Sequence, residues 1–347
     1  MIHCFLGKNG SGKTNILEAI HYLAFTKGGK PGSDTDTIRY NEDHFMIRGI
    51  FEKTGNEYEV ACAFSGERKK TMMENGKEYI RFSEHIGKYP IVTVAPADIE
   101  LIWDGGEVRR RFFDTLLAQL DKEYLEHLMV YQAHLRQRNS LLKMFAERGM
   151  MDRDLLASYD EKMVASGNIL FRKRVDFVTR FTPLLERRYD FLVSGTMEKP
   201  GLQYQSELAT CDFKTELAQR LDRDLALGRT TIGTHRDDFL FTLQGKELKR
   251  FGSQGQQKSF LIALKLAEFD CLASKVGFKP LLLLDDIFDK LDDDRIVQLM
   301  KLVAGDTFGQ IFITDARPGR SLEVLRESGV KSQNFLVEGG TVERLDS

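Results

Sequence analysis

A glycine-rich run near the start of this 347-residue sequence has the residue types that bind phosphate groups. The pattern G-x-x-x-x-G-K-[ST] occurs at residues 7–14, with an apolar strand predicted before it and a helix predicted after it. Glycines let backbone N–H groups close around phosphate oxygens, and the helix N-terminus adds partial positive charge. We expect Lys13 to be catalytic through contact with the β- and γ-phosphates, and Thr14 to bind Mg²⁺. The residues predicted to bind ATP are Gly7, Asn9, Gly10, Gly12, Lys13, Thr14 and Asn15.

A pair of carboxylates at the end of a second apolar strand supplies the matching acidic groups. Asp285 and Asp286 follow four leucines at residues 281–284. We expect Asp285 to hold Mg²⁺ and Asp286 to be the catalytic general base that polarises the attacking water. An acidic strand end that only caps the next helix is the alternative. The Asp-rich turn that follows, with Asp289 and Asp292, disfavours it.

A third candidate is a polar helix start at residues 251–258, before an apolar helix predicted from Phe260. A hydroxyl, backbone N–H groups and the helix dipole converge there and would attract an anion. Taken alone, the segment is equally well interpreted as an ordinary helix N-cap.

The segments between these motifs predict an α/β fold. Strands and helices alternate around apolar strands before residue 25 and again beyond about residue 230, which is typical of a mainly parallel sheet covered on both faces. Short alternating runs from 45 to 95, with a hairpin signal at Asn75-Gly76 and an end at residues 91–94, predict a small antiparallel sheet.

Residues 108–190 predict a helical arm. Apolar residues recur at intervals of seven on both sides of a break at Arg148-Gly149, so two antiparallel helices of about 40 residues would form an arm roughly 50–60 Å long. An ordinary layer of a helical bundle is the alternative. The predicted domains are a first lobe at 1–107, an inserted helical arm at 108–228 and a second lobe at 229–347.

The composition indicates a folded chain without a strong overall charge. Fifty Lys and Arg residues against 52 Asp and Glu residues give a net charge of −2, so any nucleic acid would be bound through local basic patches. No apolar run approaches the roughly 20 residues of a membrane span, and the N-terminus lacks the pattern of a secretory signal. The four cysteines are widely spaced, which indicates reduced thiols in a cytoplasmic protein.

The order of these motifs resembles an ABC-type P-loop ATPase head, a mixed sheet with flanking helices. The chain as a whole resembles the RecF family of recombination-repair proteins, which is related to SMC-like ATPases. Four blocks carry the resemblance over nearly the whole sequence. They are the loop and helix at 7–20, Pro96-Ala97-Asp98 with residues 109–114, the segment 233–238, and the signature Ser253-Gln254-Gly255-Gln256-Gln257. Asp289 and Asp292 resemble the D-loop of such heads.

The resemblance implies a head that dimerises when ATP and Mg²⁺ are bound. Each nucleotide would lie between the Lys13 loop of one subunit and the helix start of the other, where Ser253, Gln254, Gly255 and Gln256 would contact it. Family members bind double-stranded DNA next to single-stranded gaps and assist RecA loading with RecR and RecO. Hydrolysis would be slow and DNA-stimulated, and the protein cytoplasmic, nucleoid-associated and without a membrane partner.

Three features depart from related ATPases. Family members carry a further strand pair upstream of the loop, with an aromatic-basic segment near the adenine, whereas this sequence begins one short strand before Gly7. Asp286 takes the place of the Glu found in many ABC-type heads, a choice that RecF-like proteins share. Thr314-Asp315 occupies the place where other heads have a γ-phosphate-sensing His.

Basic clusters give the candidates for contact with DNA phosphates. The chosen residues, from a predicted hairpin and the base of the arm, are Arg68, Lys69, Lys70, Arg109 and Arg110. A solvated surface is the alternative for each cluster, and the cluster at 109–111 could instead pair with the Asp-rich stretch 289–294. No base-reading helix or stacking aromatic motif is recognised, so we expect binding to backbone and shape.

Three other functions stay open on the sequence alone. An ABC ATPase subunit of a transporter would have a similar head, although a helical hairpin of this length is unusual there. An SMC-like structural or chromosome-organising ATPase would need a longer coiled coil, although short-armed relatives exist. A P-loop kinase would leave the serine-glycine helix start unexplained.

Overall fold

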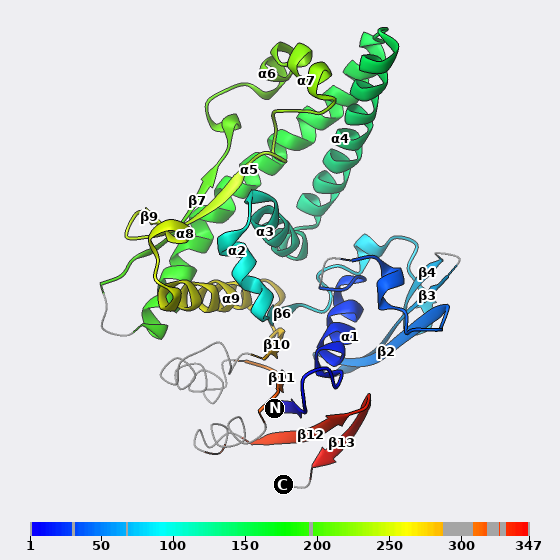
Figure 1. Cartoon of the computed structure of the whole chain (residues 1–347), viewed down its shortest axis with the longest axis vertical. Coiled ribbons are helices and arrows are strands. Elements are labelled where there is room, and N and C mark those ends of the chain that lie inside the picture. Colours follow the sequence, from blue (N-terminus) through cyan, green and yellow to red (C-terminus); the bar gives the residue numbers. More distant parts are fainter. Residues whose placement is uncertain are drawn as a thin grey trace. The chain divides into compact units, whose positions relative to one another are not determined.

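The computed structural model describes most of the chain, which divides into two compact units (Figure 1). The described residues are 2–29, 32–66, 69–193, 197–286, 308–317, 326 and 331–345. The first unit comprises 1–98, 191–194 and 258–347, and the second comprises 99–190 and 195–257. The predicted boundaries at 107 and 228 differ from this division, which falls after residues 98 and 257.

The first unit contains a six-stranded sheet in the order β13-β12-β1-β11-β10-β6. The strands are β1 (Ile2–Leu6), β6 (Ile91–Val94), β10 (Leu281–Asp285), β11 (Ile311–Asp315), β12 (Ser332–Glu338) and β13 (Thr341–Leu345). Every neighbouring pair is parallel except β12 and β13. The central strands β1 and β10 are mostly apolar and buried, as is typical of strands covered on both faces, and the predicted mainly parallel sheet is confirmed.

A smaller antiparallel sheet in the same unit has the order β2-β3-β4-β5. Its strands are β2 (His44–Lys53), β3 (Asn56–Ser65), β4 (Lys70–Glu74) and β5 (Lys77–Glu78). The predicted hairpin is confirmed, since Asn75 and Gly76 both have positive φ, 50° and 75°, as a tight hairpin turn requires. The prediction was wrong about residues 91–94, which leave this sheet and pair with β10 in the parallel one.

The helix α1 (Lys13–Phe25) covers the antiparallel sheet (Figure 1). Its apolar face joins one buried cluster with the sheet, formed among others by Leu17, Tyr22, Leu23, Val60, Cys62 and Met72. The approach is close at Gly49, where a Cβ atom would lie 2.8 Å from Leu23 Cδ1. Glycine at this position therefore lets the strand pass directly beneath the helix. Short 3₁₀ turns in this unit and at its border are Asp34–Thr37, Phe82–Glu84 and Pro96–Ile99.

The second unit is mainly helical. The helices are α2 (Glu100–Trp103), α3 (Gly106–Leu120), α4 (Lys122–Arg148), α5 (Arg153–Leu192), α6 (Phe213–Gln219), α7 (Leu221–Leu227) and α8 (Leu248–Phe251). The three longest of these, α3, α4 and α5, agree with the seven-residue spacing. The predicted break is confirmed by Gly149, which ends α4 in the left-handed conformation (φ 65°). The 40 residues of α5 span about 60 Å.

The first of the two predicted arm helices is divided at Asp121, whose carboxylate accepts a hydrogen bond from Tyr124 N (3.2 Å) and caps α4. Contacts between α4 and α5 pair residue 127 with 166 and residue 138 with 160, so the two helices run antiparallel as expected. The spaced apolar residues of α5 are buried, namely Leu156, Met163, Leu170 and Phe177.

A three-stranded sheet explains the displaced boundary between the units. Its strands are β7 (Pro200–Gln205), β8 (Asp238–Leu243) and β9 (Lys246–Glu247), in the order β7-β8-β9, and a 3₁₀ turn at Glu207–Ala209 follows β7. Because β8 pairs with β7, residues 229–257 belong with the arm helices and not with the parallel sheet. Helix α9 (Gln254–Val276) leads from this segment into the first unit. No helix of the described residues is long and apolar enough to cross a membrane.

A buried ion-pair network ties α4, α5 and α7 together. The Arg138 side chain is fully buried, and its guanidinium lies 2.6 Å from Asp160 Oδ1 and 2.7 Å from Asp224 Oδ2. Asp224 in turn accepts hydrogen bonds from Thr231 N (2.9 Å) and Oγ1 (2.7 Å). Removing one partner of such a pair leaves an uncompensated buried charge, which costs far more than the pair itself contributes.

We expect Asp224→Ala to lower the free energy of unfolding of the second unit by about 3–5 kcal/mol, because Arg138 would keep its charge without this partner. Chemical denaturation followed by circular dichroism measures the change. The control is Glu161→Ala, which removes an exposed carboxylate of α5 and should alter stability by less than about 0.5 kcal/mol. Equal losses in the two variants would contradict a structural role for the network.

Candidate nucleotide-binding site

The glycine-rich loop connects β1 to α1 at the carboxyl end of the parallel sheet. At Gly7 a Cβ atom would lie 2.3 Å from Val337 O and 2.8 Å from Ser11 Oγ. Only glycine therefore fits at the position where the loop leaves the sheet. Gly10 and Gly12 have φ of 81° and 103°, which other residues rarely adopt. The loop shape is therefore fixed by the three predicted glycines.

Lys13 lies inside the loop, and only 4% of its surface is exposed. Its ammonium group donates hydrogen bonds to Gly7 O (2.9 Å) and Lys8 O (3.0 Å). Asn9, Gly10 and Asn15 are exposed. Among the described residues, the buried Ser11 Oγ has no hydrogen-bond partner. A cation and a spare hydroxyl in a glycine loop fit a phosphate group, which accepts hydrogen bonds from both.

Thr14 and Asp285, 271 positions apart in the sequence, meet at the first turn of α1. Thr14 Oγ1 lies 3.1 and 3.3 Å from the two carboxylate oxygens of Asp285. Thr314 Oγ1 donates a further hydrogen bond of 2.6 Å to Asp285 Oδ1 and so orients the carboxylate. A hydroxyl beside a carboxylate is a donor set that Mg²⁺ accepts when phosphates and water complete its octahedron.

Asp286 follows with an unusual backbone conformation, φ 45°. Its N–H donates to the carbonyl oxygen (3.2 Å) and the hydroxyl (3.1 Å) of Thr314, and these bonds hold it beyond the sheet edge. Backbone strain of this kind in a non-glycine residue concentrates at functional sites. The predicted D-loop residues Asp289 and Asp292 lie outside the described residues.

The predicted signature segment belongs to the second unit and starts α9. Ser253 Oγ accepts from Gln256 N (3.2 Å), and Gln256 Oε1 accepts from Ser253 N (2.8 Å), which together form a capping box. Ser253 and Gln254 are exposed, and Gly255 and Gln256 are half-buried. The N-cap interpretation is therefore correct as far as the local structure goes. It does not exclude a ligand, because the Ser253 hydroxyl still has a proton to donate.

Gln256 is held by a residue that the sequence did not suggest. Its side-chain nitrogen donates to Glu198 Oε1 (2.7 Å), while Glu198 Oε2 accepts from the Tyr189 hydroxyl (2.5 Å). At Gly252 a Cβ atom would lie 2.7 Å from Leu248 O. Only glycine therefore fits at the tight turn between α8 and α9. The start of α9 is thus rigidly supported within the second unit.

Several predicted DNA contacts are engaged inside the protein. The Lys70 ammonium lies 3.0 Å from both oxygens of Asp34 and 4.7 Å from the centre of the Tyr22 ring. The Arg109 guanidinium makes two hydrogen bonds of 2.8 Å to Asp238, and only 8% of this side chain is exposed.

Lys70 and Arg109 are therefore each engaged with a carboxylate of the same chain, and their predicted contact with DNA phosphates stays a prediction. Arg109 pairs with Asp238, and the stretch 289–294 lies outside the described residues. Arg110 donates to Asp237 O, and burial lowers its pKa. Lys69 is exposed, and Arg68 lies outside the described residues.

Arg174 has a structural contact that its basic neighbours in the sequence, Arg172 and Lys173, do not suggest. Arg174 is buried and lies 2.8 Å from Asp114 and 3.2 Å from Asp237. Burial raises the pKa of the Asp237 carboxyl. Its spacing from Leu170 and Phe177 on α5 places Arg174 on the buried face, which was the available signal.

Comparisons with known proteins agree with this geometry. A family profile described as an AAA domain matches residues 2–162. The DNA replication and repair protein RecF of Flavobacterium johnsoniae is 42% identical over 327 residues, which are 94% of this chain and 91% of that protein. The protein of the same name from Bacteroides thetaiotaomicron is 43% identical over 99% of this chain and 92% of its own length.

Solved structures show the same similarity. A structure of the recombination mediator protein RecF with ATP, in the RecFOR pathway, is 29% identical with a TM-score of 0.87, and the match covers 99% of this chain and 91% of that one. The Smc head domain of Pyrococcus furiosus, bound to the C-terminal domain of ScpA, is 14% identical with a TM-score of 0.53 over 99% of this chain and 89% of that one. It supports the fold alone. Together with the RecF structures it confirms the predicted fold class, an ABC-type head with an inserted helical arm.

The sequence identity to the repair proteins extends over nearly the whole length of both chains, and the chain therefore belongs to the RecF family of DNA replication and repair proteins.

Proposed function

We propose that this chain is a DNA-repair ATPase whose ATP-bound heads dimerise on double-stranded DNA next to gaps. The observation that supports ATP hydrolysis most directly is the meeting of the Lys13 loop with the Thr14–Asp285 pair at one edge of the parallel sheet. The solved relative with ATP adds that a similar chain binds this nucleotide.

Each residue of the site has a distinct task in this proposal. The loop N–H groups and Lys13 bind the phosphates, and Thr14 with Asp285 holds Mg²⁺, which neutralises charge on the β- and γ-phosphates when bound. Asp286 accepts a proton from the attacking water. Ser253 and its neighbours at the start of α9 contact the nucleotide bound to a second copy of the chain.

Hydrolysis ends the dimeric state, so slow turnover sets the residence time on DNA. Binding is to the DNA backbone and not to base sequence. The residues proposed for phosphate contacts are still Arg68, Lys69, Lys70, Arg109 and Arg110, and among the described ones Lys69 is exposed. The RecFOR pathway named with the solved relatives supports RecR and RecO as partners in RecA loading.

The repair function is favoured over the alternatives by the pattern of similarity. Relatives at 42–43% identity are named as repair proteins, whereas the SMC head is similar at 14% identity and shares only the fold. A transporter subunit or a kinase has no support among these relatives.

Lys13→Ala should weaken ATP binding by about 10–100-fold, since charge-assisted hydrogen bonds contribute roughly 1.5–3 kcal/mol each. A titration with a fluorescent ATP analogue measures the dissociation constant. Lys8→Ala is the matched control, because that side chain is exposed in the same loop and only its carbonyl group is used. Tight binding by Lys13→Ala would exclude this loop as the nucleotide site.

Two variants separate binding from dimerisation. Asp286→Asn keeps the phosphate and Mg²⁺ contacts but lacks the base, so it should accumulate as a dimer in ATP. Ser253→Arg should stay monomeric and still bind nucleotide, because the larger side chain at the exposed N-cap would block the second subunit. Analytical ultracentrifugation with and without ATP distinguishes the states, and a monomeric Asp286→Asn protein in saturating ATP would refute the sandwich arrangement.

The decisive experiment for the function as a whole measures ATP hydrolysis and sedimentation of the unmodified protein, with and without double-stranded DNA. We expect slow hydrolysis that DNA stimulates, together with ATP-dependent dimers. A hydrolysis rate that DNA does not change would support the ATPase assignment and contradict the proposed function in DNA repair.

A further inference from the structure

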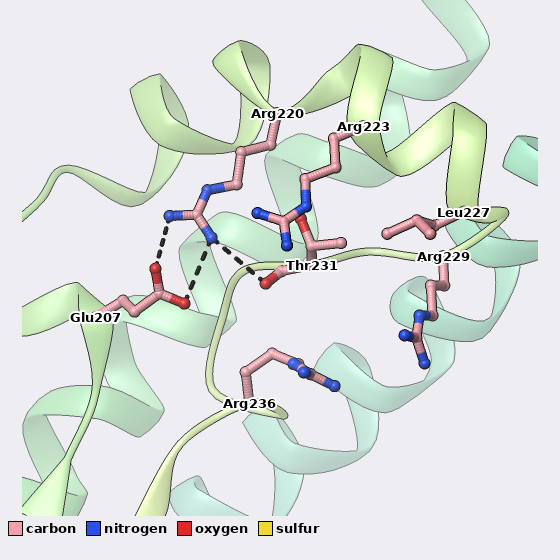
Figure 2. Close-up of a pocket in the computed structure, with 7 residues that line it drawn as sticks. All are labelled: Glu207, Arg220, Arg223, Leu227, Arg229, Thr231 and Arg236. Carbon is pink, nitrogen blue, oxygen red and sulfur yellow. Dashed lines mark hydrogen bonds and ion pairs between the residues drawn. The ribbon is translucent and has the colours of Figure 1, made fainter.

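A pocket of about 300 Å³ in the second unit is lined by four arginine side chains (Figure 2). Its lining residues are Glu207, Arg220, Arg223, Leu227, Arg229, Thr231 and Arg236. They come from α7, from the residue between α6 and α7, from the segment that leads to β8, and from the turn after β7. None of them lies in the nucleotide site or among the basic residues predicted from the sequence.

Arg220 is the structural member of the group. Its guanidinium lies 2.6 Å from Glu207 Oε2 and 2.8 Å from Glu216 Oε1, and these two carboxylates raise its pKa. It also lies 3.5 Å from the carbonyl oxygen of Thr231. Two carboxylates thus engage Arg220, which fixes one wall of the pocket and adds no positive charge to it.

The other three arginines keep their charge. Arg223, Arg229 and Arg236 are exposed, and within the described part of the chain their guanidinium groups have neither an ion-pair nor a hydrogen-bond partner. Figure 2 shows arginines on both sides of the segment that carries Thr231. Like charges gathered around one concavity repel each other, and binding of an anion would remove this cost.

The pocket is held in shape before any ligand binds. Gly228 ends α7 in the left-handed conformation and turns the chain. Thr230 donates from its N–H and its hydroxyl to Asn139 Oδ1, both at 2.8 Å, and Thr231 is held by the buried Asp224. Arg229 and Arg236 therefore project from a segment clamped to α4 and α7, so binding would cost little ordering of the backbone.

The lining identifies the class of ligand. Leu227 is its single apolar side chain, whereas pockets for small cofactors and the central pockets of protein interfaces are mostly apolar or aromatic. Three unpaired guanidinium groups suit phosphate oxygens, which they contact with paired N–H donors. No aromatic or amide side chain is present in the lining to read a base, so the contact would be independent of sequence.

We propose that this pocket binds the phosphate backbone of double-stranded DNA through Arg223, Arg229 and Arg236. The inference rests on the proposed DNA binding and adds a contact site in the helical unit, separate from the nucleotide site. A duplex carries phosphates at every step along both strands, so several can approach the three arginines at once.

The test compares the unmodified protein with a triple variant, Arg223→Gln, Arg229→Gln and Arg236→Gln. Fluorescence anisotropy with a labelled random-sequence duplex, in ATP and Mg²⁺, gives the dissociation constant at a series of salt concentrations. We expect binding at least about tenfold weaker and a salt slope reduced by roughly 2–3, since each phosphate contact contributes about 0.9 to the slope. Hydrolysis of ATP without DNA should be unchanged.

The matched control removes three exposed arginines of α5 that lie outside the pocket, by Arg153→Gln, Arg172→Gln and Arg180→Gln. Equal weakening in the control would show an effect of net charge only and would overturn the proposal. An unchanged salt slope in the pocket variant would overturn it while leaving DNA binding intact. Loss of RecR binding with normal DNA binding would also overturn it, in favour of a protein-docking site. If the unmodified protein binds no DNA, the pocket proposal and the proposed function fail together.

Discussion

The hydrogen bond from Thr14 to Asp285 joins residues 271 positions apart, and the order of strands in the first unit makes it possible. Because β1, β11 and β10 are parallel neighbours, the segments that follow them emerge at one edge. That edge therefore collects the glycine loop, the Asp285 carboxylate and the Thr314 hydroxyl that orients it. The insertion of the helical unit between residues 99 and 257 leaves this edge intact, since the strands on both sides of it still pair.

The helical unit depends on another kind of constraint. Its long helices are amphipathic, but their register is also fixed by buried cations that each meet carboxylates: Arg138 with Asp160 and Asp224, and Arg174 with Asp114 and Asp237. Apolar residues spaced by seven tolerate a slip by one repeat, whereas a buried charge that loses its partner is penalised heavily. These pairs therefore give the helices a single alignment.

The sequence was sufficient to predict what local chemistry determines. The loop, the acidic strand end, the hairpin at Asn75-Gly76 and the break at Gly149 are all read from residue types at fixed spacing. The partners of charged residues were not predictable, because an arginine that binds a carboxylate far along the chain has the same local pattern as a solvated one. Arg109 and Lys70 were assigned to DNA on that ground, and their carboxylate partners become visible only in the folded chain.

The ion-pair partners of the arginines also distinguish the arginine pocket from the interior of the helical unit. The buried arginines of this unit each meet carboxylates, whereas the exposed Arg223, Arg229 and Arg236 surround one concavity without an ion-pair partner among the described residues. Asp224 takes part in both the buried ion-pair network and the pocket wall. It faces Arg138 in the interior and accepts hydrogen bonds from Thr231 in the pocket wall. The stability of the helical unit and the shape of the pocket are therefore coupled through one carboxylate, and a change that loosens the interior would also disperse the arginines at the surface.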